Sequence, residues 1–418
     1  MANATSWMNS TQLIAALKRK ISFPIASATF SEQDLLDFAN EEMMIGQVPA
    51  ILEHHEEYFV SYVVVPLQSN KSRYAIPKRA IGDKLRDVFY ADNQIIPGQD
   101  YGNLYEMTQI DAGQKAFFQQ NAANPDVIQG FYLEGSDIVI TPGANQSPTG
   151  SLVMYYFMRP NQLVPINRAA TATAFLKNIE IDNASIADGD VLTIGEQQFT
   201  AVTGSPLSNE FLIGASSILT ATNLVNAINS NGEYSASNGT PSTATVTVSY
   251  SIVTTDFSTV NEDAIIISPL QVVQFDSIPD NIANNTKIDF LQTPGAHKTY
   301  KFDILLSNSA ISGNQITFSS GVVPDNFEIG DYICTAGECI IPQIPSDLHN
   351  GLAERSSARV LAAIGDQAGL QVTNAKIQDI ISAENKMISN RVEGAAKKVN
   401  NTHSILRYGK WNGWRRNS

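Results

Sequence analysis

The sequence predicts an α+β fold: a helical body with a central antiparallel β-region, an inserted small α+β domain, and a long C-terminal helix with an extended tail. Apolar residues recur at helical spacing near both ends, strand-like runs fill much of the first third, and the composition changes near residue 169. With 418 residues, 43% of them hydrophobic, the chain is long enough for two or three domains. We expect the first part of the core at 1–168, the inserted domain at 169–275, a returning β-region at 276–345, C-terminal helices that complete the core at 346–406, and the tail at 407–418.

The first third is expected to begin with helices and to continue with strands. "TQLIAALKRK" is a short amphipathic helix, and "SEQDLLDFANEEMM" is a stronger one that Ser31 caps and whose apolar face includes Leu35, Phe38 and Ala39. Another helix start follows at "VPAILEHHEEY", with Pro49 near its first turn. The expected strands come next, in "YFVSYVVVPL", "RYAIPKRAI", "KLRDVFYA", "GFYLEGSDIVITP" and "GSLVMYYFMRP", and "EGSD" is a hairpin turn.

The segment from Ala169 to Phe275 differs from the rest in composition. It is rich in Thr, Ser, Asn, Ala and Val, and it carries ten acidic residues against Lys177 alone. Two strands are expected around "GE" at 195–196, and further strands in "ATVTVSYSIVTTD" and "DAIIISP". Between them "SSILTATNLVNAINSNG" predicts a helix whose apolar side includes Ile218, Leu224, Val225 and Ile228. Such a unit with its own core is typical of an inserted domain.

The last part of the chain returns to strands and then becomes helical. Strand-like runs occur in "HKTYKFDILLS", "NQITFSSG" and "GDYICTAGECIIPQIP". "SDLHNGLAERSSARVLAAIG" then predicts a helix that Ser346 caps and Gly365 ends.

A second C-terminal helix is expected from about Asp366 to about Val399. At 1.5 Å per residue it would be roughly 45 Å long or more. Such a length exceeds what one small domain covers. We therefore expect part of its apolar stripe to contact a neighbouring subunit or another protein, through Ile377, Ile381 and Ile388.

Charge is distributed unevenly along the chain. The formal net charge is −14, yet the residues from Lys386 onward hold eight Lys and Arg against Glu393 alone, so this end carries +7 and the preceding residues −21. The final segment, "RYGKWNGWRRNS", combines aromatic and basic side chains without an acidic one. An acidic body does not bind nucleic acid broadly. The basic end therefore predicts a local contact, with an acidic protein surface or a phosphate backbone.

The sequence holds no recognisable catalytic or cofactor motif, and we expect no enzyme activity, no cofactor and no metal site. It lacks a phosphate-binding loop, a serine nucleophile elbow, the zinc-protease motif and an EF-hand loop. "HHEE" at 54–57 is interpreted as a solvated helix end, and "DGD" at 188–190 as a turn before a strand. Cys334 and Cys339 in "CTAGEC" leave three alternatives: a small disulfide, half of a metal site, or two reduced thiols beside a glycine turn. The third is favoured because no partner cluster stands nearby.

Several segments resemble one protein family in order. "TQLIAALKRKISFPIASATFSEQDLLDFANEEM" resembles the N-terminal helical segment of head-to-tail adaptor (connector, head completion) proteins of tailed bacteriophages, the type that forms a portal-bound ring. "YYFMRPNQLV" is similar to the segment that ends their central β-region, and "IPQIPSDLHNGLAERSSARVLAAIGD" to the return into the helical body. The resemblance covers roughly 11–168 and 287–399. Within the insertion, "DGDVLTIGEQQFTAVTG" and "TATNLVNAIN" are similar to a small module that recurs in phage structural proteins.

The resemblance implies a structural virion protein in the neck between capsid and tail, assembled in the host cytoplasm. Its copies would form a ring, commonly a dodecamer, beneath the portal protein, in contact with tail or neck proteins. Double-stranded DNA would pass through the channel without specific binding during genome ejection, and an acidic lining would favour sliding. The C-terminal extension would dock on the portal, with aromatic anchors and cationic ion partners at Tyr408, Lys410, Trp411, Trp414, Arg415 and Arg416.

A second hypothesis comes from another class of protein: a tail or capsid-surface binding protein whose inserted domain recognises a host receptor or glycan. Particle mass separates the two, because the first predicts a portal-dependent ring and the second a monomer or trimer that binds cells. The sequence shows no apolar run of about 18 residues and no signal peptide, so we expect no membrane partner under either hypothesis.

Overall fold

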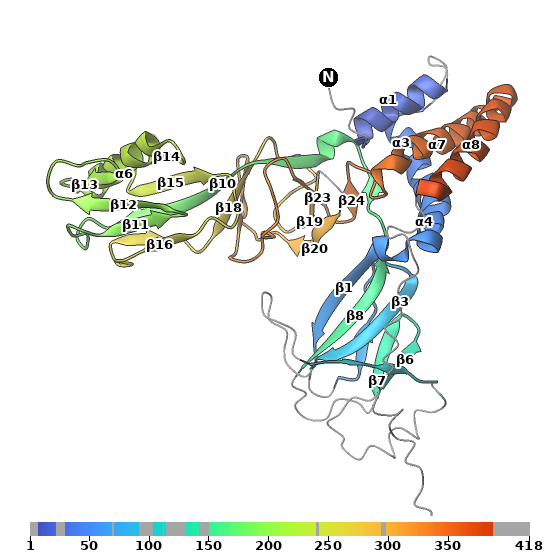
Figure 1. Ribbon diagram of the computed structural model, residues 1–418, viewed down its shortest axis with the longest axis horizontal. Helices are drawn as coiled ribbons and strands as arrows, with labels where there is room; N and C mark the ends of the chain where they lie inside the picture. The colour runs from blue at the N-terminus through green and yellow to red at the C-terminus, as the bar shows by residue number, and fades with distance from the viewer. Residues whose placement is uncertain are drawn as a thin grey trace, which may run out of the picture.

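The computed structural model describes residues 7–21, 30–68, 71–91, 103–111, 113, 130–141, 150–239, 242–293 and 298–387. These residues form a mixed α+β structure in which strands outnumber helices, so the predicted fold class is confirmed at that level. Figure 1 shows three parts that meet at one corner: a group of helices, a β-sandwich below it, and a long β-arm that projects to the side.

The helical part combines helices from both ends of the chain. They are α1 (Ser10–Lys20), α3 (Glu32–Glu42), α4 (Val48–His54), α7 (His349–Ile364) and α8 (Gln367–Met387), with a π-helical turn at Met43–Gln47 and 3-10 turns at Glu56–Phe59, Ile166–Arg168 and Ser346–Leu348. Their buried residues form one core with neighbouring strands, and they include Leu13, Leu17, Leu36, Ile51 and Leu352. None of the described helices is long and apolar enough to cross a membrane.

The helix ends follow local sequence signals at most positions. Ser31 forms a reciprocal capping box at the start of α3, and Gly365 ends α7 with a left-handed φ of 82°, as predicted. The predicted N-cap at Ser346 is wrong. After Pro345 the chain first makes a 3-10 turn, and α7 begins beyond it with no side-chain cap. α8 has 21 residues, about 30 Å, and the predicted continuation to Val399 lies outside the described residues.

The β-sandwich consists of two four-stranded sheets with a shared core. One sheet has the order β1 (Val60–Pro66), β8 (Ser151–Met158), β3 (Ala80–Ala91) and β4 (Leu104–Glu106), and the other has β2 (Arg73–Ala75), β7 (Asp137–Thr141), β6 (Gly130–Glu134) and β5 (Thr108–Gln109). The core between them includes Val88, Met154 and Tyr156 from the first sheet and Ile138 and Ile140 from the second. The strands predicted in this region are confirmed, including the hairpin turn at 134–137.

The arm is built on one long strand, β10 (Ala169–Ile181). Successive stretches of β10 pair with β23 (Tyr332–Thr335), β18 (Gln271–Phe275), and then β15 (Thr245–Tyr250) and β17 (Ile265–Ile267). The same sheet contains β20 (Thr299–Leu305), β19 (Lys287–Leu291), β22 (Gln315–Phe318), β21 (Ile311–Ser312) and β14 (Ser235–Ser237). β24 (Glu338–Cys339) pairs in parallel with β9 (Gln162–Leu163) where the arm meets the helices.

Two hydrophobic clusters divide the arm into a proximal and a distal lobe. The proximal cluster surrounds Phe175, Phe290 and Phe327 and takes buried residues from both sides of residue 275. The distal lobe, 179–267, has its own core and adds α6 (Ser217–Asn231) and a four-stranded sheet of β13 (Glu210–Leu212), β12 (Gln197–Val202), β11 (Val191–Ile194) and β16 (Phe257–Thr259). It occupies the far end of the arm in Figure 1.

The predicted helix of the insertion lies at the predicted place, with one misassigned residue. In α6, Leu224, Val225 and Ile228 are buried in the distal core, whereas Ile218 is 48% exposed. The placement of Ile218 on the buried side is wrong. The first turns of α6 are buried at Thr220 and Ala221, which leaves Ile218 at the exposed start of the helix.

We predict that residues 178–268 fold alone, although the sequence placed the domain boundaries at 169 and 275. All buried residues of the distal core lie within 179–265, and the Ser268 amide donates to the Asn178 carbonyl at 2.9 Å, so the cut ends are adjacent. The fragment 178–268 should unfold cooperatively on heating, as followed by circular dichroism. A matched fragment, 169–275, should aggregate more because Phe175, Val273 and Phe275 lose their proximal partners. If the fragment 178–268 showed no cooperative transition, the prediction would be contradicted.

Candidate assembly surfaces

The titratable clusters that stand out in the sequence lie at surface turns. His54 ends α4 and is exposed, as is Glu57. Asp188 accepts a hydrogen bond from the Thr203 amide at 2.7 Å, and Asp190 accepts one from the amide that begins the same turn, also at 2.7 Å. Both aspartates therefore hold the turn before β11. Within the described ranges, no three potential metal ligands gather in one place.

Three segments that are far apart in the sequence meet through direct polar contacts. Asn40 in α3 accepts a hydrogen bond from the Leu163 amide at 2.7 Å and donates one to the Leu163 carbonyl at 3.1 Å. In the same helix, Glu42 accepts a hydrogen bond from Arg359 Nε at 2.7 Å and lies 3.6 Å from Arg355 Nη1. The "NEEM", "RPNQLV" and "AERSSAR" segments thus form one structural unit, in which the first segment contacts both others.

α8 is held against the helical part by a buried ion pair. Arg355 in α7 donates from Nη2 to Glu384 Oε2 at 2.8 Å, and Gln47 donates to the other oxygen of the same carboxylate at 3.2 Å. Glu384 and Thr373 are buried polar residues of α8. These contacts fix the position of α8 against α7 and the π-helical turn.

The predicted interface stripe of α8 is partly covered within the chain. Ile377 and Ile381 are half-buried, and Val372 on the same helix is 59% exposed. Ile388 lies outside the described residues, as do all the predicted portal-binding positions, Tyr408, Lys410, Trp411, Trp414, Arg415 and Arg416. The structure thus shows apolar side chains at Ile377 and Ile381 that have area left for a partner.

The sandwich and the arm meet at one buried carboxylate, Asp289 in β19, next to the connection to the helices. Its oxygens accept hydrogen bonds from Arg79 Nη1 (2.8 Å) and Nη2 (2.9 Å), Asn161 Nδ2 (2.8 Å), the Asp303 amide (2.9 Å) and the Gly337 amide (3.0 Å). Arg79 precedes the sandwich strand β3, Asn161 follows β8, and Gly337 precedes β24. Asp289 therefore joins the sandwich, the arm and the connection to the helices.

The Arg79 guanidinium is compensated on both sides. It also lies 3.1 Å from Asp303, whose side chain is 43% exposed, whereas that of Asp289 is fully buried. Burial by itself would lower the pKa of Arg79, but the charges of Asp289 and Asp303 and their hydrogen bonds outweigh it, and the net pKa is raised. Arg79 therefore stays charged, and its guanidinium has no free N–H group left to bind a ligand.

Sequence reasoning identified the segment around Asn161 but not its partners. Arg79 and Asp289 are 210 residues apart and neither belongs to a motif, so no local pattern pointed to them. A buried Asp in a strand-like run, as in "KIDFL", is the one signal that could have been noticed, because charged residues are almost never fully buried unless paired.

Cys334 and Cys339 are free and buried, so of the three alternatives the structure has two unlinked thiols. Cys339 lies in β24, and its Sγ is 3.4 Å from the Asn161 carbonyl. Burial raises the pKa of both thiols, because the charged form is disfavoured away from water. Both cysteines are therefore protonated at neutral pH and pack as small apolar groups.

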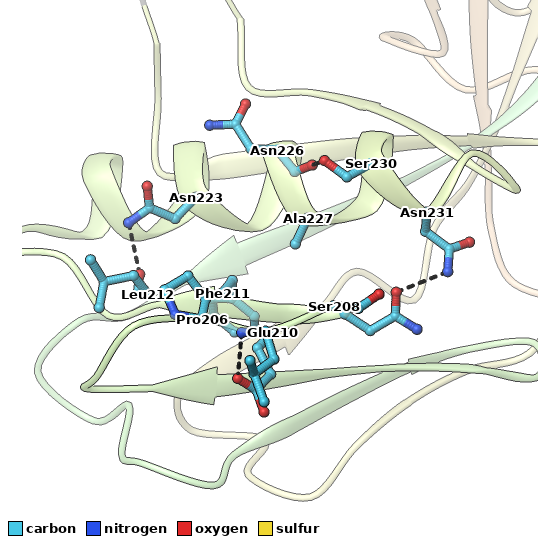
Figure 2. Close-up of a pocket in the computed structure, with 12 residues that line it drawn as sticks. Pro206, Ser208, Glu210, Phe211, Leu212, Asn223, Asn226, Ala227, Ser230 and Asn231 are labelled. Atoms are coloured by element: carbon cyan, nitrogen blue, oxygen red, sulfur yellow. Dashed lines mark hydrogen bonds between the residues drawn. The ribbon is translucent and has the colours of Figure 1, made fainter.

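The distal lobe carries a groove of about 360 Å³ between α6 and the segment that leads into β13. Figure 2 shows amide side chains along it: Asn223 donates to the Leu212 carbonyl at 2.8 Å, and Asn231 donates to Asn209 at 3.0 Å. The Glu210 carboxylate accepts a hydrogen bond from the Leu207 amide at 2.7 Å. The groove is therefore polar with little free charge.

Comparison with known proteins identifies no relative. No protein-family model matches the chain, and no curated protein sequence matches it.

We predict that Asp289→Asn lowers the free energy of unfolding by about 3 kcal/mol or more. All five of its hydrogen-bond partners are donors, so a side-chain amide would face donors and leave Arg79 short of charge. The matched control is Asp303→Asn, which removes a half-exposed partner of the same guanidinium and should cost about 1 kcal/mol or less. Urea unfolding at neutral pH measures both changes. Equal costs for the two variants would contradict the central role of Asp289.

Proposed function

We propose that this chain is a structural, non-enzymatic ring protein of the virion neck, between the capsid portal and the tail of a tailed bacteriophage. Copies would assemble side by side, as a dodecamer in the resembling family, around a channel for genome passage. Double-stranded DNA would pass without specific binding, and tail or neck proteins would contact the distal side. The finer architecture of the family, a helical body with a central β-region and a long C-terminal helix, is part of the proposal.

One observation carries the proposal: the motif residues of the resemblance contact one another. Asn40 binds the backbone of Leu163, and Glu42 pairs with Arg359, so residues from three separated matching segments build one unit. Chance similarity of short segments has no reason to select residues that form direct contacts across more than 300 positions. The half-buried Ile377 and Ile381 support the ring, because each copy keeps apolar area on α8 for a neighbour.

The alternative, a surface protein that recognises a host receptor or glycan, is favoured by the polar groove of the distal lobe. Its amide and hydroxyl groups suit a neutral, hydroxylated ligand. Purified protein mixed with portal rings separates the two functions. Ring density on the portal in electron micrographs supports the neck function, whereas an unbound monomer or trimer that adsorbs to host cells supports the alternative.

We predict that Ile377→Asp combined with Ile381→Asp prevents ring formation. Two charges would be placed in a contact that excludes water, at a cost of several kcal/mol per contact. The matched control is Ala375→Asp with Gln378→Asp, which adds equal charge to exposed positions of α8. Electron microscopy counts the rings and circular dichroism checks the fold. Normal rings from the first variant would show that this stripe packs only within its own copy.

We predict that Trp411→Ala with Trp414→Ala weakens portal binding more than Arg415→Gln with Arg416→Gln at physiological salt. Burial of the indoles supplies roughly 25 cal/mol per Å² of apolar area, whereas exposed ion pairs contribute little and mainly set register and encounter rate. Binding to immobilised portal rings at two salt concentrations measures both. The charge variant should lose most of the salt dependence. If truncation after Leu406 left portal binding intact and abolished DNA binding, the tail would bind phosphate instead.

A further inference from the structure

A basic cleft of about 510 Å³ lies at the corner where the three parts meet. Its lining includes Lys78, Arg79, Arg159, Lys287 and Asp303. The Arg159 amide donates to the Arg79 carbonyl at 2.7 Å, and the Ala336 amide donates to the Lys287 carbonyl at 2.8 Å. These backbone bonds hold the cation-bearing segments at one rim.

Three cationic side chains of this cleft have no interaction partner among the described residues. Arg79 is committed to Asp289 and Asp303, but Lys78, Arg159 and Lys287 have no ion pair or hydrogen-bond partner among the described residues, and all three are exposed. In the helical part, by contrast, Lys18, Lys20, Arg355 and Arg359 are all paired with carboxylates. In a molecule with net charge −14, this cleft thus brings together three cations that have no partner among the described residues.

The complementary free charge lies on the distal lobe. Residues 179–267 contain ten acidic residues and no Lys or Arg, and none of these carboxylates forms an ion pair with another described residue. Asp182, Asp188, Asp190 and Glu210 accept hydrogen bonds in local turns, and the other six are exposed. Of these six, Glu180, Glu262 and Asp263 lie beside the pairing of β10 with β17 and have no hydrogen-bond partner in the described structure. The register places Glu180 opposite Ile266, so these three carboxylates, the acidic corner, lie at one edge of the lobe.

The acidic corner cannot reach the cleft of its own copy, because the distal lobe occupies the opposite end of the arm from the cleft (Figure 1). We propose that the cleft binds the acidic corner of a second copy of this chain. The contact is heterologous, since two different surfaces meet, and repeated contacts of this kind close into a ring or continue as a filament. The inference deepens the proposed ring function by naming one of its interfaces.

The test reverses the charges of the cleft in the full-length protein, with Lys78→Glu, Arg159→Glu and Lys287→Glu together. Sedimentation velocity at low and physiological salt should show self-association weakened about tenfold or more, because three attractive pairs become repulsive. The matched control, Lys71→Glu, Lys84→Glu and Lys298→Glu, changes the same charge outside the cleft and should associate like the natural sequence. Circular dichroism confirms that both variants fold.

A charge swap tests whether the acidic corner of a second copy is the surface that binds the cleft. Glu180→Lys, Glu262→Lys and Asp263→Lys should weaken association alone and restore it when combined with the reversed cleft. Unchanged association of the cleft variant, failure of the swap to restore it, or a natural protein that stays monomeric would each overturn the inference. So would a cleft variant that keeps self-association and loses binding to a short DNA duplex, because the cleft would then take phosphate. Open chains that respond to the swap but form no rings on the portal would support this contact and contradict the neck function.

Discussion

A buried carboxylate surrounded only by donors organises this molecule. Asp289 is fully buried, and moving a lone carboxylate out of water costs several kcal/mol, so it is tolerated only because Arg79, Asn161 and two backbone amides satisfy it. These donors come from the sandwich, the arm and the turn before β24. The bonds that compensate for this burial also fix the sandwich and the arm relative to one another, because separating them would leave the buried charges of Asp289 and Arg79 unpaired.

The helical part is also held together by ion pairs, but their side chains are less deeply buried than Asp289. Glu42, Arg355, Arg359 and Glu384 link α3, α7 and α8 by alternating charges, so the two ends of the chain are joined by directional contacts as well as by the apolar core. Directional contacts define the position of α8 and leave apolar area at Ile377 uncovered. A part with a rigid centre and partly covered flanks is suited to assembly. The residual surfaces are presented in a fixed geometry, so little ordering entropy is lost on contact.

Sequence patterns predicted a structural feature correctly where that feature depends only on neighbouring residues. The capping box at Ser31, the hairpin at 134–137 and the helix end at Gly365 depend on neighbouring residues, and each is present. The misses have a physical cause. At Ser346 a preceding proline favoured a 3-10 turn, and Ile218 lies where α6 extends past its core, a boundary that periodicity alone cannot locate. The domain division stays a prediction, and composition alone does not separate the two cores of the arm: the proximal core takes buried residues from both sides of residue 275, whereas the distal core lies within 179–265.

The sequence by itself determined the α+β class, the order of helices and strands, the acidic distal lobe and the basic, aromatic C-terminal segment, because these follow from short-range periodicity and counted charge. Only the tertiary structure decided which charged side chains are paired and which are left without a partner. It paired Arg79 with Asp289 across 210 residues, joined Asn40 to Leu163, and left Lys78, Arg159 and Lys287 free at one cleft. Pairing between distant residues depends on how strands and helices pack in space, and that arrangement is set by the whole chain at once rather than by any segment of it.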